Sequence, residues 1–457
     1  MVFLFLNTLQ PKPRQPSISL RQLLYDYKAH PPCFSRFCIL TNHTKTTPWF
    51  DYPTYSWQTK HAVIVGGGIA GCQMAWHLCQ ANWQITLIER HKKIATEASG
   101  NPVGVILPKM TSQKSNGEDF YSACFEYALS QLDILKQQGK TVDWKQCGAL
   151  QLTHNTRENN RWNALNKREF SDEFLQLLNE NDTSQQAGID LPYKSSYFPQ
   201  AGWIKPDSFC HALSDHTNCK VIVEKEAVTL SKNDTHWQVL NTNSETIVQA
   251  EAVIICGGKD LFSFEQSNFL PSMPVTGQTT FAIAENDSKK LKTVIGHEGY
   301  LTPAIDNQHI FGATFERENN TPSLTLQADE KNREQLNKYL PEFCAKLSAF
   351  TSAHTAVRMT TPDRFPYIGA LPDREFYQNN YHDLHQGKHY KTYPQAKYQD
   401  GLFMLGGLGS RGLTTSGFCA KNLCDLLENK TSSHNQLLHS CHPARFLVKA
   451  LKQNKNL

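Results

Sequence analysis

Short apolar runs alternate with amphipathic stretches along most of this chain. Residues 61–65 form a β-branched run typical of a buried parallel strand, and a helical pattern follows over residues 70–81. A second strand is expected at 84–89, which completes a strand–turn–helix–strand unit of about 30 residues. Residues 252–258 predict another buried strand that ends in glycines, and residues 401–409 a strand followed by a loop.

The remaining pattern predicts a second, mixed domain. Further helices are expected at 119–139, 328–349 and 417–428, short strands at 148–152, 221–223 and 237–240, and a β-rich stretch at 274–316. The fold class is therefore α/β: a Rossmann-type nucleotide-binding domain with an inserted α+β substrate domain dominated by a mixed or antiparallel sheet. We assign residues 58–145, 200–262 and 355–440 to the first domain, 146–199 and 263–354 to the second, and 441–457 to a basic C-terminal tail.

The first 60 residues differ from the rest of the chain. They contain no glycine, and their only acidic residues are Asp26 and Asp51. Residues 1–57 are interpreted as an extension and linker with one short helix at 19–28. The segment 47–53 is expected to run extended, because proline disfavours helix on both sides.

Composition narrows the function classes. The net charge of +4 permits a polyanionic partner without requiring one. The 13 cysteines are scattered without a Cys-x-x-Cys pair, which favours reduced thiols in the cytoplasm over a disulfide framework, and no metal site is expected. No apolar run approaches the roughly 18 residues of a membrane span, and the N-terminus lacks the marks of a signal peptide.

The sequence 66–71, Gly-Gly-Gly-Ile-Ala-Gly, matches G-x-G-x-x-G between a strand and a helix, which is the context that gives the motif meaning. Gly66 allows the tight turn, Gly68 a close approach of the backbone to a pyrophosphate, and Gly71 close helix–strand packing. Glu89 ends the second strand, where an acid accepts hydrogen bonds from an adenosine ribose and disfavours a 2′-phosphate. This loop predicts FAD or NAD.

Two further loops favour FAD. A small-residue loop at 97–104 follows the acid, and a glycine-rich loop at 406–412 follows a late strand. A long flavin cofactor needs contacts from both ends of a chain, whereas a nicotinamide cofactor is held by one compact domain.

The glycine loop, residues 98–101, 197–203, 274–278 and 362–369 resemble the D-amino-acid oxidase and glycine oxidase superfamily. Within it, residues 299–303, 357–366, 408–413 and 442–449 are most similar to the FAD-dependent, C-terminal half of the bifunctional tRNA wobble-uridine modification family (MnmC). That family carries a methyltransferase domain before the FAD domain. The glycine-free residues 1–57 are expected to contain none, so a separate methyltransferase is a candidate partner.

The resemblance implies a FAD site and a reaction. The residues expected to bind FAD are Gly66, Gly68, Ile69, Ala70, Gly71, Glu89, Arg90, Ser99, Gly100, Asn101, Gly104, Gly257, Gly258, Gly407, Gly409, Ser410, Gly412 and Leu413. The implied substrate is the carboxymethylaminomethyl group of a tRNA wobble uridine, oxidised to give aminomethyluridine and glyoxylate.

Three residues are candidates for the catalytic site. A carboxylate in a partly dry pocket calls for a guanidinium, which Arg411 or Arg358 would supply, and Tyr300 would hydrogen-bond the same group. The alternatives are a structural salt bridge or a solvated arginine, and a half-buried strand tyrosine. His297 and His309 are assigned no role, and no general base is evident.

The tRNA partner follows from the resemblance, because the wobble base lies in a single-stranded loop. In the basic tail, Arg445, Lys449 and Lys452 would share one helical face, which would bind phosphate or be simply solvated. Two other functions stay open: oxidation of a small free amine such as glycine or sarcosine, and a non-enzymatic, flavin-containing tRNA-binding scaffold.

Overall fold

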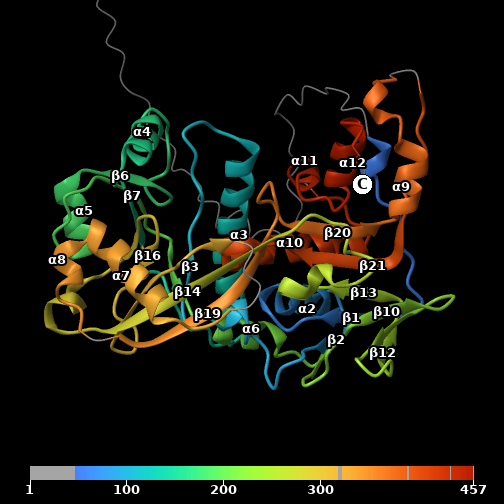
Figure 1. Ribbon diagram of the computed structural model, residues 1–457, viewed down its shortest axis with the longest axis horizontal. Helices are drawn as coiled ribbons and strands as arrows, with labels where there is room; N and C mark the ends of the chain where they lie inside the picture. The colour runs from blue at the N-terminus through green and yellow to red at the C-terminus, as the bar shows by residue number, and fades with distance from the viewer. Residues whose placement is uncertain (1–46, 318–321, 349, 389–390, 433, 456–457) are drawn as a thin grey trace, which may run out of the picture. The chain divides into compact units, whose positions relative to one another are not determined.

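The computed structural model describes residues 47–457 except 318–321, 349, 389–390, 433 and 456–457 (Figure 1). The helix expected at 19–28 and most of the proposed N-terminal extension lie outside the described residues. Pro48–Phe50 forms a single turn of 3-10 helix (η2), so the prediction of an extended segment was wrong here. Proline opens this turn at its first position, where its missing N–H is not needed.

A six-stranded sheet carries the nucleotide-binding motif. Its order is β20-β21-β13-β1-β2-β9; all neighbouring pairs are parallel except β20–β21. Strands β1, β2 and β13 are buried along almost their whole length and β21 over residues 401–406, which explains their continuous apolar runs. The strands are β1 (His61–Val65), β2 (Gln84–Ile88), β9 (Cys219–Ile222), β13 (Ala252–Ile255), β20 (Tyr367–Pro372) and β21 (Tyr398–Gly406).

Helices pack beside this sheet and close the largest core. Helix α2 (Ile69–Gln80) contacts both α6 (Pro206–Ser214) and α10 (Gly412–Leu427), and α10 also packs on α3 (Asn116–Gln137). Helix α10 begins five residues before the predicted start at 417, because the glycine-rich loop passes directly into it.

The second large sheet has nine strands, with β19 paired to β14 beside the order β18-β14-β17-β16-β15-β5-β7-β6. Among the described strands of this sheet, only β5 and β15 pair in parallel, so the predicted mixed, largely antiparallel sheet is confirmed. Its strands are β5 (Ala149–Leu152), β6 (Gln176–Leu178), β7 (Ser195–Phe198), β14 (Met273–Ile283), β15 (Val294–Gly296), β16 (Tyr300–Leu301), β17 (Gln308–Gly312), β18 (Glu316–Arg317) and β19 (Phe350–Thr360).

Two small sheets and the remaining helices complete the described fold. Helix α7 (Leu326–Tyr339) lies against β14 and β17, and in Figure 1 the long strands β14 and β19 run from this region toward the parallel sheet. One small sheet consists of β3 (Gly104–Ile106), β8 (Gly202–Ile204) and β4 (Trp144–Lys145). The other consists of β10 (Thr229–Lys232), β11 (Trp237–Leu240) and β12 (Thr246–Ala250). The helices are α4 (Thr156–Leu165), α5 (Glu180–Ala187), α7 (Leu326–Tyr339), α8 (Pro341–Cys344), α9 (Arg374–Tyr381), α11 (Asn435–His439) and α12 (Arg445–Lys452), with 3-10 turns η3 (Ala98–Gly100), η4 (Gly258–Phe262), η5 (Asn286–Lys290), η6 (Leu384–Gln386) and η7 (Gly409–Arg411).

The C-terminal helix α12 corrects the prediction of a basic face. Arg445 forms an ion pair with Asp363 at 2.8 Å, and its guanidinium lies over the rings of Tyr367 and Phe446. Lys449 and Lys452 are exposed. Arg445 therefore anchors α12 to the rest of the fold and is not free to bind phosphate. The pairing involves a residue 82 positions away, which helical periodicity does not reveal.

Candidate active site

The carboxyl ends of four parallel strands meet at one edge of the six-stranded sheet, where an open α/β sheet binds its ligand. The segments that follow β1, β2, β13 and β21 all line one cavity of about 750 Å³. Its far wall comes from the nine-stranded sheet, through residues of β14, β16 and β19. The cavity thus lies between the two large sheets.

The glycine loop opens into this cavity. Gly66 has φ +109°, and a Cβ on it would lie 2.8 Å from the carbonyl oxygen of Cys256. A Cβ on Gly71 would collide with the carbonyl oxygen of Gly66. The N-cap residue of α2, Gly68, has no side chain, and the Ser99 hydroxyl accepts a hydrogen bond from the backbone N–H of Ile69 at 2.9 Å. Gly68, Ile69 and Ala70 line the cavity. The first turn of the helix therefore presents partial positive charge to the cavity, which suits a pyrophosphate.

Glu89 ties the glycine loop to the end of β2. Its buried carboxylate accepts hydrogen bonds from the backbone N–H groups of Gly67 and His91, both at 2.9 Å. Each carboxylate oxygen has a second lone pair, and Glu89 lines the cavity. Glu89 can therefore hold the glycine loop and at the same time accept a hydrogen bond from a ribose hydroxyl.

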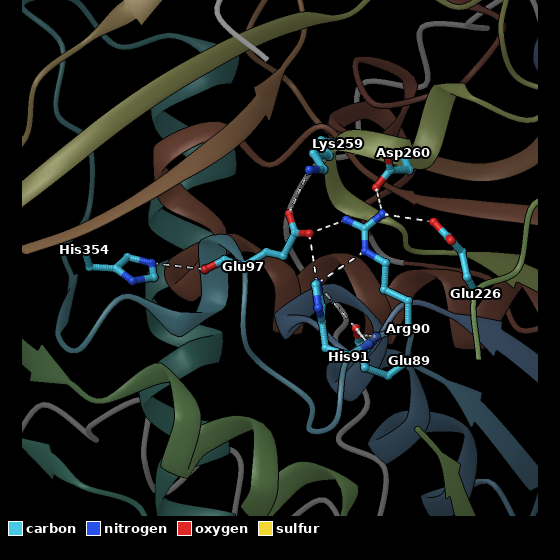
Figure 2. A network of polar contacts seen from close by, with 9 residues as sticks. Glu89, Arg90, His91, Glu97, Glu226, Lys259, Asp260 and His354 are labelled. Carbon is cyan, nitrogen blue, oxygen red and sulfur yellow. Dashed lines mark hydrogen bonds and ion pairs between the residues drawn. The ribbon is translucent and has the colours of Figure 1, made fainter. Parts of the chain in front are cut away.

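Arg90 is the centre of a charged network at this end of the cavity (Figure 2). Its guanidinium pairs with Glu97, with Asp260 at 2.7 Å and with Glu226 at 3.6 Å. These three carboxylates come from separate loops that all line the cavity. Arg90 was predicted as a cofactor-binding residue, and the structure shows its charge engaged by protein carboxylates. Its evident part is to position the surrounding loops.

Glu97 links the network to the nine-stranded sheet. His91 contacts its carboxylate at 3.0 Å, Lys259 lies 3.7 Å away, and His354 of β19 hydrogen-bonds its backbone carbonyl at 3.2 Å. Burial raises the pKa of the Glu97 carboxyl, but the hydrogen bond from His91 and the charge of Arg90 lower the pKa by more than burial raises it. The net pKa is therefore below its usual value. The carboxylate is thus held ionised between the two sheets.

The late glycine loop closes on the early one. Gly407 and Gly409 have φ of +69° and +58°, a conformation that glycine adopts without strain. A Cβ on Gly412 would lie 3.5 Å from Cγ2 of Ile69, and the side chain of Leu413 fills the space where a Cβ on Gly104 would lie. Segments more than 300 residues apart therefore meet across one cavity, as the sequence analysis requires.

Arg358 and Tyr300 lie together on the sheet side of the cavity. The Arg358 guanidinium donates a hydrogen bond to the carbonyl of Thr314 at 3.2 Å, and among the described residues it forms no ion pair with a carboxylate. Burial lowers its pKa, and the nearby Tyr300 raises it. Burial raises the pKa of Tyr300, whereas a hydrogen bond with Asn101 and the charge of Arg358 lower it. The net pKa of Tyr300 is above its usual value. The phenol is protonated and the arginine charged at neutral pH.

Arg411 occupies a different wall. Its guanidinium donates to the carbonyls of Leu107 and Pro108 at 3.2 and 3.4 Å and lies over the ring of Tyr121. Within the part of the chain that the structure describes, it too has no carboxylate partner. Arg411 lines both this cavity and a smaller one beside it.

His297, which has no predicted role, also lines the cavity. Its Nδ1 accepts a hydrogen bond from the backbone N–H of Gly299 at 3.0 Å, so a neutral ring carries its proton on Nε2. Burial lowers its pKa to about 4, so the ring is neutral at pH 7. Nε2 is buried without a hydrogen-bond partner among the described residues and remains available as a donor.

The cavity brings together every predicted site residue except Gly71 and Gly100, which lie behind its wall. Sequence reasoning missed a second set of lining residues, which the nine-stranded sheet and the edge of the six-stranded sheet supply. They include Gln151, Lys225, Glu226, Val228, Lys259, Phe264, His297, Phe315 and His354. The position of Lys225–Val228 after the strand predicted at 221–223 was the one available signal, because that strand ends at the same sheet edge.

The residues present fit FAD. The cavity volume is within the usual range for a cofactor site, and the N-terminus of α2, the acid at the end of β2 and close-packed glycines line it. The buried hydroxyl of Thr96 in the same wall lacks a partner among the described side chains. No described group of histidine, cysteine or acidic residues is arranged to hold a metal ion.

Comparison with known proteins identifies the class. Residues 61–426 match the model of the FAD dependent oxidoreductase family, so the chain belongs to that family. FAD is accordingly its cofactor. The family accounts for both the parallel sheet and the inserted, largely antiparallel one.

Individual relatives narrow the comparison. The chain is 33% identical over 423 residues to the tRNA 5-methylaminomethyl-2-thiouridine biosynthesis bifunctional protein MnmC of Pseudomonas syringae pv. tomato, covering 90% of this chain and 63% of that protein. It is 30% identical over 416 residues to the protein of the same name from Chromobacterium violaceum, covering 89% and 62%. The chain thus spans less than two thirds of the curated relatives it matches.

Solved structures share the fold at low identity. Glycine oxidase from Geobacillus kaustophilus has a TM-score of 0.67 at 16% identity, covering 84% of this chain and 98% of that one. Iminodiacetate oxidase from Chelativorans sp. BNC1 has a TM-score of 0.65 at 17% identity, with the same coverage of both chains.

Proposed function

We propose that this protein is the oxidase of a tRNA wobble-uridine modification. Its substrate would be the carboxymethylaminomethyl group at position 5 of the uridine or 2-thiouridine, and its products the aminomethyl nucleoside and glyoxylate. The chemistry is supported by the site, and the tRNA substrate by the relatives named MnmC. The observation that carries the proposal is Arg358 beside Tyr300 in the FAD cavity, with no carboxylate partner among the described residues.

Bound FAD would accept the hydride from the carbon between amine and carboxylate, so that the C–N single bond becomes the double bond of a protonated imine. Water adds to this imine, and the C–N bond breaks to release glyoxylate and the primary amine. The residues of the chain mainly have to hold and orient the substrate.

Arg358 would bind the substrate carboxylate through its planar pair of N–H donors, and the phenol of Tyr300 would donate to the same group. Asn101 positions Tyr300, since its side-chain amide contacts the Tyr300 hydroxyl at 3.5 Å and accepts from Thr279 at 3.1 Å. Arg411 would contribute positive charge from the opposite wall. The neutral His297 would donate from Nε2 and, with Nδ1 already occupied by Gly299, is not a general base.

Two further parts of the proposal concern the cell. A cytoplasmic location is supported by the described cysteines, which are all free. Among the described helices, none has both the length and the apolarity needed to cross a bilayer. A separate methyltransferase would be the partner that consumes the aminomethyl product, because a primary amine is a methyl acceptor.

Anaerobic reduction of the bound flavin tests the proposal. Transfer RNA that carries the carboxymethylaminomethyl group should bleach the flavin absorption, whereas glycine and sarcosine should not. Bleaching by the free amino acids alone would favour the small-amine oxidase instead. Failure of all three to reduce the flavin would leave the non-enzymatic scaffold.

A further inference from the structure

A small cavity of about 50 Å³ adjoins the FAD cavity, and Leu107, Gln151 and Arg411 line both. Two more basic residues, Lys109 and Arg161, line the small cavity. Arg411 therefore stands between the reaction site and a region where further positive charges gather.

Three segments distant in sequence supply these further charges. Lys109 follows β3, Arg157 and Arg161 stand one turn apart on α4, and Arg364 lies in the turn between β19 and β20. Burial lowers the pKa of Lys109, and the charges of Arg411, Arg364, Arg161 and Arg157 lower it further. Arg157 and Arg364 are exposed, whereas Lys109 and Arg161 are half-buried.

The protein leaves most of this charge uncompensated. Glu158 is the acidic residue lining the small cavity, and it pairs with Arg161 at 2.5 Å. Among the described residues, no carboxylate forms an ion pair with Lys109, Arg157 or Arg364.

An aromatic ring holds part of the cluster together. The Lys109 ammonium lies 4.9 Å and the Arg411 guanidinium 5.5 Å from the centroid of Tyr121, whose hydroxyl donates to the carbonyl of Arg364 at 2.8 Å. A tyrosine face attracts cations without neutralising them. Like charges gathered in this way repel one another, and a bound polyanion would relieve that repulsion.

We propose that Lys109, Arg157 and Arg364, here called the basic rim, bind backbone phosphates of the RNA strand that flanks the substrate base. This inference rests on the proposed function. A single carboxylate needs one guanidinium, whereas a run of phosphates along a strand matches several cations spread from an exposed edge to a cavity wall. The shared lining residues place the basic rim directly beside the cavity in which the base would react.

Salt-dependent binding of a fluorescent anticodon stem-loop RNA to the FAD-bound protein tests the inference. For the triple variant K109Q/R157Q/R364Q we expect at least tenfold weaker binding at low salt. Its slope of log K against log salt should be smaller by about 0.7 for each lost contact, roughly two in all. Its flavin absorption should be unchanged, because none of the three side chains lines the FAD cavity.

K449Q/K452Q is the matched control, since both lysines are exposed on α12. It should bind the RNA within twofold of the wild type. If the triple variant keeps the affinity and the salt slope of the wild type, the basic rim is wrong and the proposed function stays intact. An equal loss of affinity in the control variant would have the same meaning. A wild-type protein that binds no RNA at any salt concentration would overturn both.

Discussion

At the scale of single residues, the chemistry depends on cations that the fold does not neutralise. Arg358 donates to one carbonyl and keeps the rest of its guanidinium for a ligand, whereas Arg445 is paired with Asp363. Both residues are arginines, so residue type alone does not tell which one can bind a ligand. The groups that each guanidinium contacts in the fold decide it.

Arg358→Lys keeps the charge and removes the planar pair of donors. We expect kcat/KM for the modified tRNA to fall roughly tenfold to a hundredfold, as for the loss of a hydrogen bond to a charged group. The flavin spectrum should stay as in the wild type. Steady-state kinetics would decide, and full activity in this variant would exclude Arg358 as the group that holds the carboxylate.

His77 shows how one buried side chain makes the fold sensitive to acid. Its Nδ1 contacts the carbonyl of Gln73 at 2.9 Å, its Nε2 contacts the hydroxyl of Tyr127 at 2.7 Å, and burial lowers its pKa to about 3. Below pH 6.5 the unfolded chain takes up a proton at this position and the folded chain does not. Stability contributed by neutral His77 is therefore lost as the pH falls from 6.5 toward 3.

His77→Gln should flatten the dependence of unfolding free energy on pH. The histidine accounts for about 2 to 3 kcal/mol of the stability lost between pH 6.5 and 4.5, and the variant should lack that loss whatever its stability at pH 7. Urea unfolding across this range measures the effect. The exposed His211→Gln should keep the wild-type slope, and a wild-type slope in His77→Gln would show the prediction to be wrong.

At the scale of elements, the glycine loop works because α2 packs directly against it. Gly71→Ala would drive a methyl group into the carbonyl oxygen of Gly66. We expect a loss of about 1–3 kcal/mol in stability and a lower flavin content after purification. Gly117→Ala in α3, whose new Cβ would meet Phe365 at 3.6 Å, is the control and should retain both properties.

Arg90 joins β2 to the loops around η4 and residue 226. Arg90→Gln would leave Glu97, Glu226 and Asp260 to repel one another and the FAD pyrophosphate, so FAD should dissociate roughly tenfold more readily. Equilibrium dialysis measures this change. Adding Asp260→Asn should restore part of the affinity, and Lys232→Gln, which breaks an exposed pair with Asp400, should have no effect. Unaltered FAD retention in Arg90→Gln would contradict the positioning role.

At the scale of the whole molecule, local motifs were predictable and distant pairings were not. Residues 66–71, Glu89 and residues 406–412 carry their chemistry in short patterns, and the structure brings them to one cavity. The basic rim draws on three separate segments, and His297 gains its free donor from a turn that no pattern marks. Such features depend on how the nine-stranded sheet meets the parallel one, which a single sequence does not specify.

The central claim is that the FAD-bound protein removes a carboxymethyl group from tRNA. Mass spectrometry of wobble nucleosides after incubation with carboxymethylaminomethyl-modified tRNA tests it most directly. We predict loss of the mass of the carboxymethyl group and one glyoxylate for each aminomethyl nucleoside formed, and neither product with Arg358→Ala. An unchanged nucleoside, in a preparation whose flavin is bound and reducible by dithionite, would contradict the account.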